Sequence, residues 1–211
     1  LDEDRIEGYR NFCNKLWNAS RFVFMNLEGY EGTCQLNEQA QRSIADQWIL
    51  SRLNATTQDV NQALENFRFN DAALTVYKFI WNEYCDWYIE FAKSRLVTEG
   101  PEKNTAQNVL LHVLEASLKL LHPFMPFITE EIWQKLPKEG DSIMVSPFPE
   151  FKEDGNDSKV EADMGKVMEV ITGVRNIRGE MNLNPGLKLN ALVKTRHADL
   201  EAILKKHAHL I

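Results

Sequence analysis

The side chains best suited to binding chemistry lie together in residues 10–21, a stretch that reads RNFCNKLWNASR and contains no acidic residue. A helix turns by about 100° per residue, so Arg10, Asn14, Trp17 and Arg21 share one face, opposite the stripe of Phe12, Leu16 and Val23. Arginine pairs with phosphate and stacks on bases, and the indole of tryptophan offers a further stacking plane. With Lys15 as a third cation, this pattern indicates an RNA-binding face.

The same pattern has a simpler interpretation, in which the basic face is solvated and Trp17 packs on a neighbouring helix. The residues alone favour that alternative. A second pair of cations, Arg175 and Arg178, lies three residues apart on one expected helix face. Cations near a helix C-terminus offset the helix dipole, which accounts for this pair without RNA. Both arginines are kept as candidates for RNA contact.

The sequence holds no arrangement typical of catalysis or of metal binding. Neither of the common glycine-rich phosphate loops occurs, and no cysteine–histidine group has the spacing of zinc ligands. His112 and His122 lie on apolar helical sequence, where a histidine is usually a core residue. Glu130 and Glu131 are adjacent, so on a helix they point about 100° apart. We therefore expect no catalytic residue, no metal and no cofactor in this chain.

Composition places the chain among ordinary globular proteins. Its 211 residues suffice for one large or two small domains, and 44% of them are hydrophobic and 26% charged. No apolar stretch reaches the ~18 residues of a membrane span, and the first residues resemble no signal peptide. The net charge of −7 argues weakly against nucleic-acid binding without excluding it, because binding depends on local patches.

Three further expectations follow from small features of the sequence. The three cysteines are odd in number and share no metal spacing, which predicts reduced thiols in a cytosolic protein. The first residue is Leu1 rather than methionine, so we expect the chain to be part of a longer protein. We also expect a monomer.

Apolar residues at helical spacing predict a mainly α fold. Helices are expected around residues 12–23, from about 37–43 to 67, from 70–71 to a break at Gly100–Pro101, over 105–121 and over 126–136. His122–Pro123 separates the last two, because proline lacks an amide donor and clashes with the preceding turn. Antiparallel helices joined by short loops form a bundle, which we place at residues 1–137.

The composition changes after Pro137. Residues 141–145 predict a short strand, and residues 138–159 as a whole predict a strand followed by a polar linker. Residues 160–211 predict a small α/β segment. It would consist of a helix over 160–181, a turn at 184–186, a strand over 187–193 with alternating apolar residues, and a final helix from Ala198.

Two stretches, one at each end of the expected bundle, resemble a known family. Residues 11–23, NFCNKLWNASRFV, are similar to the opening of the anticodon-binding helical domain of class I aminoacyl-tRNA synthetases for aliphatic amino acids. Residues 120–133, LLHPFMPFITEEIW, are similar to the motif that closes that domain. The wording KLWNASRFV, together with residues 81–93 (WNEYCDWYIEFAK) and 175–185 (RNIRGEMNLNP), resembles the valine-specific members. Isoleucine-specific members look similar in the first stretch and differ in the other two.

The resemblance, which covers almost the whole chain, implies a longer enzyme that attaches valine to tRNA(Val) with ATP, edits mischarged threonine and serves protein synthesis in the cytoplasm. The family's HIGH-type and KMSKS-type motifs and its editing domain are not in this sequence, so the chain itself is expected to be inactive. The implied partners are the anticodon stem-loop of tRNA(Val) and the catalytic domain of the same polypeptide, with no membrane. Residues after about 160 would lead toward a C-terminal coiled-coil arm outside this chain.

The resemblance also changes the interpretation of single residues. It gives more weight to the basic face of residues 10–21 as an RNA surface. It adds Tyr30, between Gly29 and Gly32, as a candidate to stack on an anticodon base. A loop aromatic that merely covers the bundle is the alternative for Tyr30. At the level of function, the alternatives are the equivalent domain of an isoleucine or leucine enzyme, and a helical protein-interaction module without RNA binding.

Overall fold

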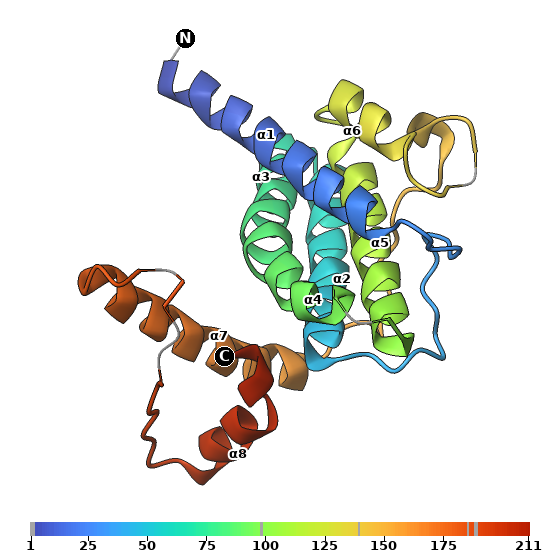
Figure 1. The fold of residues 1–211 in the computed structure, drawn as a ribbon. Helices are drawn as coiled ribbons and strands as arrows, with labels where there is room; N and C mark the ends of the chain where they lie inside the picture. The colour runs from blue at the N-terminus through green and yellow to red at the C-terminus, as the bar shows by residue number, and fades with distance from the viewer. Residues whose placement is uncertain (1–2, 98, 139, 185, 188–189) are drawn as a thin grey trace. The chain divides into compact units, whose positions relative to one another are not determined.

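The computed structural model describes residues 3–97, 99–138, 140–184, 186–187 and 190–211. These residues form two compact units, 1–157 and 158–211, which are described one after the other. Unit 1 is a helical bundle, and unit 2 is a smaller helical segment (Figure 1). Among the described helices, none combines the length and the apolar character needed to cross a lipid bilayer.

Unit 1 is built around two long helices, α2 (Ile44–Glu65) and α5 (Pro101–Leu121), which pack on each other. Against α2 lies α3 (Phe69–Lys78), which continues through the π-helix η1 (Phe79–Tyr88) into α4 (Ile89–Leu96), and α4 lies against α5. The long α1 (Glu3–Asn26) crosses this group and contacts η1, α5 and the short α6 (Pro126–Trp133) (Figure 1). The predicted bundle of helices is therefore confirmed.

Local signals fix where these helices begin. Ser43 caps α2 through a capping box, in which its hydroxyl accepts from the amide of Asp46 and the Asp46 carboxylate accepts from the amide of Ser43. Proline occupies the first position of α5 and of α6, where no amide donor is needed. The fully buried large side chains come mainly from α5 and η1, and include Trp133, Tyr84, Tyr88, Phe79, Leu16, Leu110, Leu114 and Leu118.

The helix predicted after residue 70 differs from expectation in its middle. The helical spacing of Tyr77, Ile80, Tyr84 and Trp87 predicts one buried face. Tyr77 and Trp87 are nevertheless only half-buried, whereas Val76 and Tyr88 are fully buried. The reason is η1, where hydrogen bonds run from i to i+5 and each residue turns the chain by less than in an α-helix. Ile80, Tyr84 and Tyr88, spaced by four, therefore stay on one buried face.

The polar stretch predicted as a linker lies along α2. The Asn54 side chain donates to the carbonyl oxygen of Lys152 at 2.8 Å and accepts from the amide of Lys152 at 2.9 Å. The amide of Asp157 donates to the Ser51 hydroxyl at 2.8 Å. These bonds fix residues 152–157 on unit 1.

The predicted strand at residues 141–145 is wrong. Ile143–Val145 forms the 3-10 helix η2, because the Ser142 hydroxyl accepts from the amide of Met144 and folds the backbone into a turn. In the second predicted strand, Leu187 and residues 190–193 adopt no strand, and residues 188–189 lie outside the described residues. The described part of the chain holds no strand at all, so no partner is available for a ladder.

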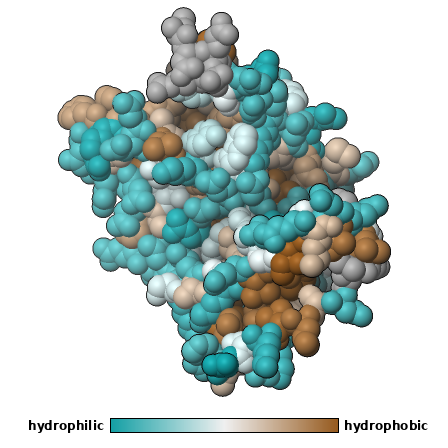
Figure 2. Space-filling view, turned by 90° about the vertical axis from the view of Figure 1, so that its left-hand side faces the viewer, coloured by the Kyte–Doolittle hydropathy of each residue, from teal (hydrophilic) through white to brown (hydrophobic). Residues whose placement is uncertain are grey.

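Unit 2 consists of α7 (Ser158–Glu180), α8 (Ala198–Lys206) and the 3-10 helix η3 (Ala208–Leu210). Met164, Val167 and Ile171 of α7 and Leu204 of α8 are buried. Exposed apolar side chains are also frequent in this unit, and Leu192 is 97% exposed. Figure 2 shows a predominantly hydrophilic surface with one extended hydrophobic area at its lower right.

Candidate nucleic-acid interface

The basic face of α1 is exposed as its periodicity predicts. Phe12, Leu16 and Val23 are buried against the bundle. On the opposite side, Arg10, Asn14 and Arg21 are exposed, and Trp17 is 37% exposed. The helix therefore presents cations, an amide and an aromatic ring to solvent along one line.

The cations of this face are not equivalent. The Arg10 guanidinium donates to the Glu7 carboxylate at 2.9 Å, which neutralises part of its charge. Arg21 makes no hydrogen bond and no ion pair with any described residue. Lys135, which follows α6, places its ammonium 4.8 Å from the centre of the Trp17 ring, while also pairing with Glu131. The positive centre of the face therefore lies at Arg21, while Lys135, like Arg10, is partly neutralised by its carboxylate partner.

Lys15 lies elsewhere, in the seam between α1 and η1. Its ammonium is 2.5 Å from the Asp86 carboxylate and 3.8 Å from the centre of the Trp81 ring. The side chain is 24% exposed. Lys15 thus links α1 to the π-helix. Any contribution of Lys15 to RNA binding would come through the exposed carboxylate of Asp86, which it positions.

Tyr30 lies in the loop between α1 and α2, and its hydroxyl accepts from the Asn108 amide at 3.0 Å. Its ring lies directly over Gly32, where an added Cβ would be 2.1 Å from the hydroxyl oxygen. Burial raises the pKa of this hydroxyl. The placement supports the alternative in which Tyr30 covers the bundle, and base stacking by Tyr30 stays a prediction.

Asn108 of α5 holds the same loop at several points. Its amide nitrogen also lies 2.9 Å from the Gln35 carbonyl oxygen, and its amide oxygen accepts from the amide of Asn37 at 2.9 Å. Neighbouring polar residues of α5 continue the pattern, since Gln107 donates to the Asn26 carbonyl and His112 to the Cys34 carbonyl. Sequence periodicity gave no sign of these contacts, because they join residues more than 70 positions apart.

The burial of His112 makes the stability of the chain depend on pH. Burial lowers the pKa of His112 below its ordinary value, against the opposing effect of the Cys34 carbonyl. The unfolded chain therefore binds the proton first, and stability should fall as the pH drops below about 6.5. His112→Asn keeps a donor for the carbonyl and removes the titration. We expect urea midpoints of the two proteins to converge between pH 7 and pH 5, and a constant difference would contradict this assignment.

A buried ion pair joins the start of α2 to α4. Arg95 donates two hydrogen bonds of 2.6 Å to the two oxygens of the Asp46 carboxylate, and the Tyr88 hydroxyl donates to the same carboxylate at 2.6 Å. Asp46 is fully buried and the Arg95 side chain is 15% exposed. All carboxylate oxygens are thus satisfied, and the arrangement has the character of a structural link.

Comparison with known proteins decides the family. Residues 46–193 match the family described as the anticodon-binding domain of tRNA ligase. The chain belongs to this family. The family match begins at residue 46, after α1. Similarity to whole proteins covers 98% of the chain and therefore includes α1 as well.

Relatives of this anticodon-binding domain are named valine–tRNA ligases. The protein from Geobacter sulfurreducens is 50% identical over 210 residues, which are 98% of this chain and 24% of that protein. The protein from Thermotoga maritima is 48% identical over 92% of this chain and 22% of its own length. The chain therefore spans about a quarter of the relatives that it matches.

A solved structure shares the fold of the anticodon-binding domain. It is the LeuRS of Agrobacterium radiobacter K84 in a ternary complex with tRNA and LeuAMS, with a TM-score of 0.54 and 16% identity. The match covers 92% of this chain and 25% of that chain. At this identity the likeness supports the helical architecture alone.

Arg175 and Arg178 of the anticodon-binding domain lie in unit 2, in the last turns of α7. With Gly179, Asn182, Leu183 and Asn184 they line a hollow of about 620 Å³. The Arg178 guanidinium donates to the Asn184 carbonyl oxygen at 3.0 Å. The two predicted arginines are thus brought together, beside two asparagines that the sequence did not single out.

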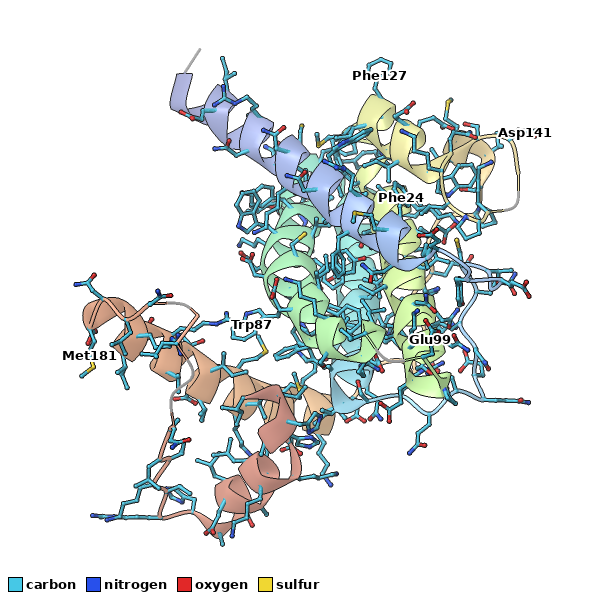
Figure 3. All side chains as sticks on the ribbon, viewed as in Figure 1. Phe24, Trp87, Glu99, Phe127, Asp141 and Met181 are labelled. Atoms are coloured by element: carbon cyan, nitrogen blue, oxygen red, sulfur yellow. The ribbon has the colours of Figure 1, made fainter. Side chains whose placement is uncertain are left out.

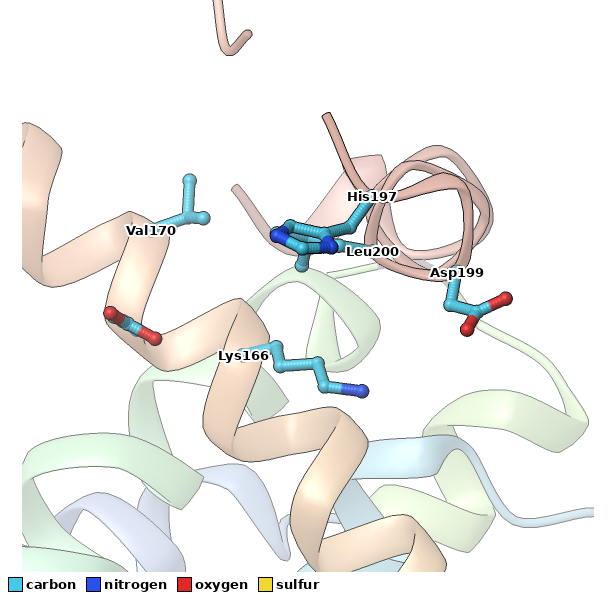
Figure 4. A pocket seen from close by; sticks show the side chains of 6 residues that line it. Lys166, Val170, His197, Asp199 and Leu200 are labelled. Carbon is cyan, nitrogen blue, oxygen red and sulfur yellow. The ribbon is translucent and has the colours of Figure 1, made fainter. Parts of the chain in front are cut away.

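A further hollow of about 560 Å³ lies between α7 and α8 (Figure 4). Lys166 and Glu169 line it from α7, and His197 and Asp199 from the start of α8. Its lining also includes Val170 and Leu200. Within the described residues, no group of three or more metal-ligating side chains converges here or elsewhere.

Proposed function

We propose that this chain binds the anticodon arm of tRNA as one part of a valine–tRNA ligase. The observation that carries the proposal is the exposed face of α1, which combines a guanidinium without a described partner, a cation and a partly exposed indole. Membership of the anticodon-binding family supports the anticodon arm as the ligand. Identities of 42–50% with valine–tRNA ligases support valine as the amino acid.

In the proposed full-length enzyme, segments outside this chain bind ATP and valine and hold the catalytic and editing sites. The partners of this chain are tRNA(Val) and the catalytic domain of the same polypeptide, in a cytoplasmic monomer. Its task is to add affinity and specificity for the correct tRNA, so that the enzyme charges the matching adaptor in translation.

The side chains have different proposed roles. Arg21 and Lys135 approach backbone phosphates, and Trp17 offers a plane for a base, since single-stranded loops are recognised by stacking and charge. Asn14 donates or accepts hydrogen bonds beside them. Arg10 contributes the part of its positive charge that its ion pair with Glu7 does not neutralise. Lys15 positions Asp86. In unit 2, Arg175 and Arg178 are proposed as a second contact with the tRNA backbone.

Arg21→Glu should weaken binding of tRNA(Val) by about tenfold or more, because a charge-assisted hydrogen bond contributes about 1.5–3 kcal/mol and 1.4 kcal/mol is tenfold in affinity. Losing one phosphate contact should also lower the slope of log affinity against log salt by about 1. Filter binding across a salt series measures both quantities.

Arg68→Glu is the matched control, since Arg68 is exposed, pairs with Asp71 and belongs to the α2–α3 turn rather than to α1. It makes the same change in net charge and should leave the affinity within a factor of about two. A folded Arg21→Glu protein with wild-type affinity at every salt concentration would place the RNA surface elsewhere. Equal binding of isoleucine and leucine tRNAs would favour the related enzymes, and absence of salt-dependent tRNA binding would favour a protein-interaction module.

A further inference from the structure

The carboxylate of Asp86 is exposed and has one oxygen free. Asp86 lies on η1, which contacts α1, and the next residue, Trp87, is labelled in Figure 3. The Asp86 side chain is 47% exposed, and its oxygen Oδ1 accepts from the Lys15 ammonium at 2.5 Å. The other oxygen, Oδ2, makes no hydrogen bond with any described residue. The carboxylate therefore presents one hydrogen-bond acceptor to solvent.

The cation that holds Asp86 is itself fixed by packing. The Lys15 ammonium lies 3.8 Å from the centre of the Trp81 ring, in a cation–π contact. The Trp81 ring stacks on that of Tyr77, 5.8 Å away, and the Phe12 ring lies 4.8 Å from Tyr77 and 6.4 Å from Trp81. Ion pairs on a surface usually join mobile side chains. Here three rings and a cation fix the direction of one exposed carboxylate.

The Asp86 carboxylate borders the side of α1 that carries Arg21. A helix turns by about 100° per residue, so Arg21, Asn18 and Lys15 follow one another around the α1 axis in steps of about 60°. Arg21 and Asn18 are exposed, and Lys15 reaches the carboxylate. A polar surface therefore leads from the Arg21 guanidinium past the Asn18 amide to Asp86. An RNA loop whose phosphate contacts Arg21 can turn a base toward this acceptor.

The chemistry of a carboxylate limits what it can contact on RNA. It repels phosphate, and in its ionised form it accepts hydrogen bonds and donates none. Among the base edges, carboxylates accept from the exocyclic amine of cytosine. Uracil has a carbonyl oxygen in place of that amine, and two acceptors that face each other do not bond. A fixed carboxylate beside an RNA-binding face therefore lowers affinity for RNA in general and adds discrimination between bases.

The proposed amino acid determines which bases are available to be read. All valine codons begin with guanine and uracil, so every valine anticodon ends in adenine followed by cytosine. Isoleucine codons begin with adenine, and leucine codons begin with cytosine or uracil. The anticodons for these two amino acids share the middle adenine and end in uracil, guanine or adenine. The final cytosine is therefore the anticodon base that separates valine from isoleucine and leucine.

We propose that Asp86 is a specificity-determining residue, whose free carboxylate oxygen accepts a hydrogen bond from the exocyclic amine of the final anticodon cytosine. This inference rests on the proposed function, in which the ligand of α1 is a valine anticodon arm. Lys15 is a positioning residue, since it contacts Asp86 and not the base. In this arrangement Arg21 contacts the RNA backbone whatever its sequence, and Asp86 selects the base.

Asp86→Asn tests the proposal in the full-length ligase. The amide keeps the size of the side chain but donates as well as accepts, so it can bond to cytosine and to uracil. In the wild-type enzyme, kcat/KM for charging should fall by about tenfold or more when uracil replaces the final cytosine of tRNA(Val). In Asp86→Asn the two tRNAs should differ by less than a factor of about three. Pyrophosphate exchange measured without tRNA should be unchanged, which shows that the variant is folded.

Replacements of Lys15 test the positioning role. Lys15→Met releases the Asp86 carboxylate and should lower the preference for cytosine over uracil. Lys15→Arg keeps a cation that can contact both Asp86 and the Trp81 ring, so it should retain the preference. A preference that is unchanged in Lys15→Met would contradict the positioning role.

Glu90→Gln is the matched control. Glu90 is a carboxylate of similar exposure, 45%, at the start of α4, and it pairs with a lysine of its own, Lys93, at 2.6 Å. Its replacement removes the same charge from the same helical run, so it should affect both tRNAs alike and leave their ratio unchanged. A tRNA(Val) whose final cytosine lacks only the exocyclic amine should behave like the uracil form with the wild-type enzyme.

Three results would overturn the proposal. A ligase that charges tRNA(Val) but keeps its full preference for cytosine in Asp86→Asn would refute the role of Asp86 and leave the proposed function intact. An equal loss of preference in Glu90→Gln would replace base reading by a general effect of charge. Failure of the wild-type enzyme to charge tRNA(Val) at all would overturn the proposed function, and the role of Asp86 with it.

Discussion

Arg95→Met is expected to lower the free energy of unfolding of the chain by about 3–5 kcal/mol, because it leaves the Asp46 charge buried without its counter-ion. Asp46 is fully buried and accepts two 2.6 Å hydrogen bonds from the Arg95 guanidinium. Methionine preserves most of the length of the side chain, so lost packing contributes little. Urea denaturation followed by far-UV circular dichroism measures the change.

The double replacement Asp46→Leu with Arg95→Met provides the control. Removing both charges abolishes the desolvation cost of the remaining ion, and such exchanges are often close to neutral. The double variant should therefore be more stable than Arg95→Met alone, even though the Tyr88 hydroxyl and the amide and hydroxyl of Ser43 lose their acceptor. If the double variant is the less stable of the two, the interactions of the Asp46–Arg95 pair stabilise the fold by more than the cost of desolvating its two charges.

Asn108→Ala should cost about 1–2 kcal/mol, because it removes the hydrogen bonds by which this buried side chain holds the α1–α2 loop, whose residues Gln35 and Asn37 are themselves exposed. Asn108 is 6% exposed and bonds to the Tyr30 hydroxyl, the Gln35 carbonyl and the Asn37 amide. The loop should then become sensitive to protease between residues 27 and 43. Chemical denaturation and limited proteolysis with mapped cleavage sites check the two effects.

Asn104→Ala is the matched control for Asn108. Asn104 is the same residue type one turn earlier in α5, and its side chain is exposed. Its replacement should change stability by less than about 0.5 kcal/mol, as is usual for surface positions. Equal losses from the two replacements would mean that the hydrogen bonds to the loop do not account for the effect of Asn108→Ala, since alanine has the higher helix propensity at both positions.

The sequence predicts the bundle well where one periodicity decides the structure. The stripe of Phe12, Leu16 and Val23 is enough to place the buried face of α1, because a helix repeats every 3.6 residues. It does not predict η1, since aromatic residues spaced by four fit an α-helix and a π-helix alike. The strand predicted at residues 141–145 fails for a related reason: a strand needs a partner, and a short apolar stretch does not reveal whether one is present.

For the candidate site, the sequence predicts which side chains of α1 are exposed, but not which distant residues they contact. Arg21 and Trp17 are exposed as their helical phase requires. The approach of Lys135 to Trp17, and of Lys15 to Asp86, depends on how distant segments pack, which no local pattern encodes. Tyr30 illustrates the opposite case: two flanking glycines suggest an open ring, whereas the ring lies over Gly32 and reaches Asn108.

The π-helix η1 has a geometric consequence for the whole bundle. A π turn holds more residues than an α turn, so each residue of η1 rotates the chain by about 18° less, roughly half a revolution over its length. The helices on either side of it therefore present opposite sides of one unbroken rod. This offset in angular phase lets α3 pack on α2 while α4, on the same axis, packs on α5. Deleting a single residue from η1 would turn α4 by about a quarter of a revolution relative to α3, and α4 would turn its apolar side away from α5.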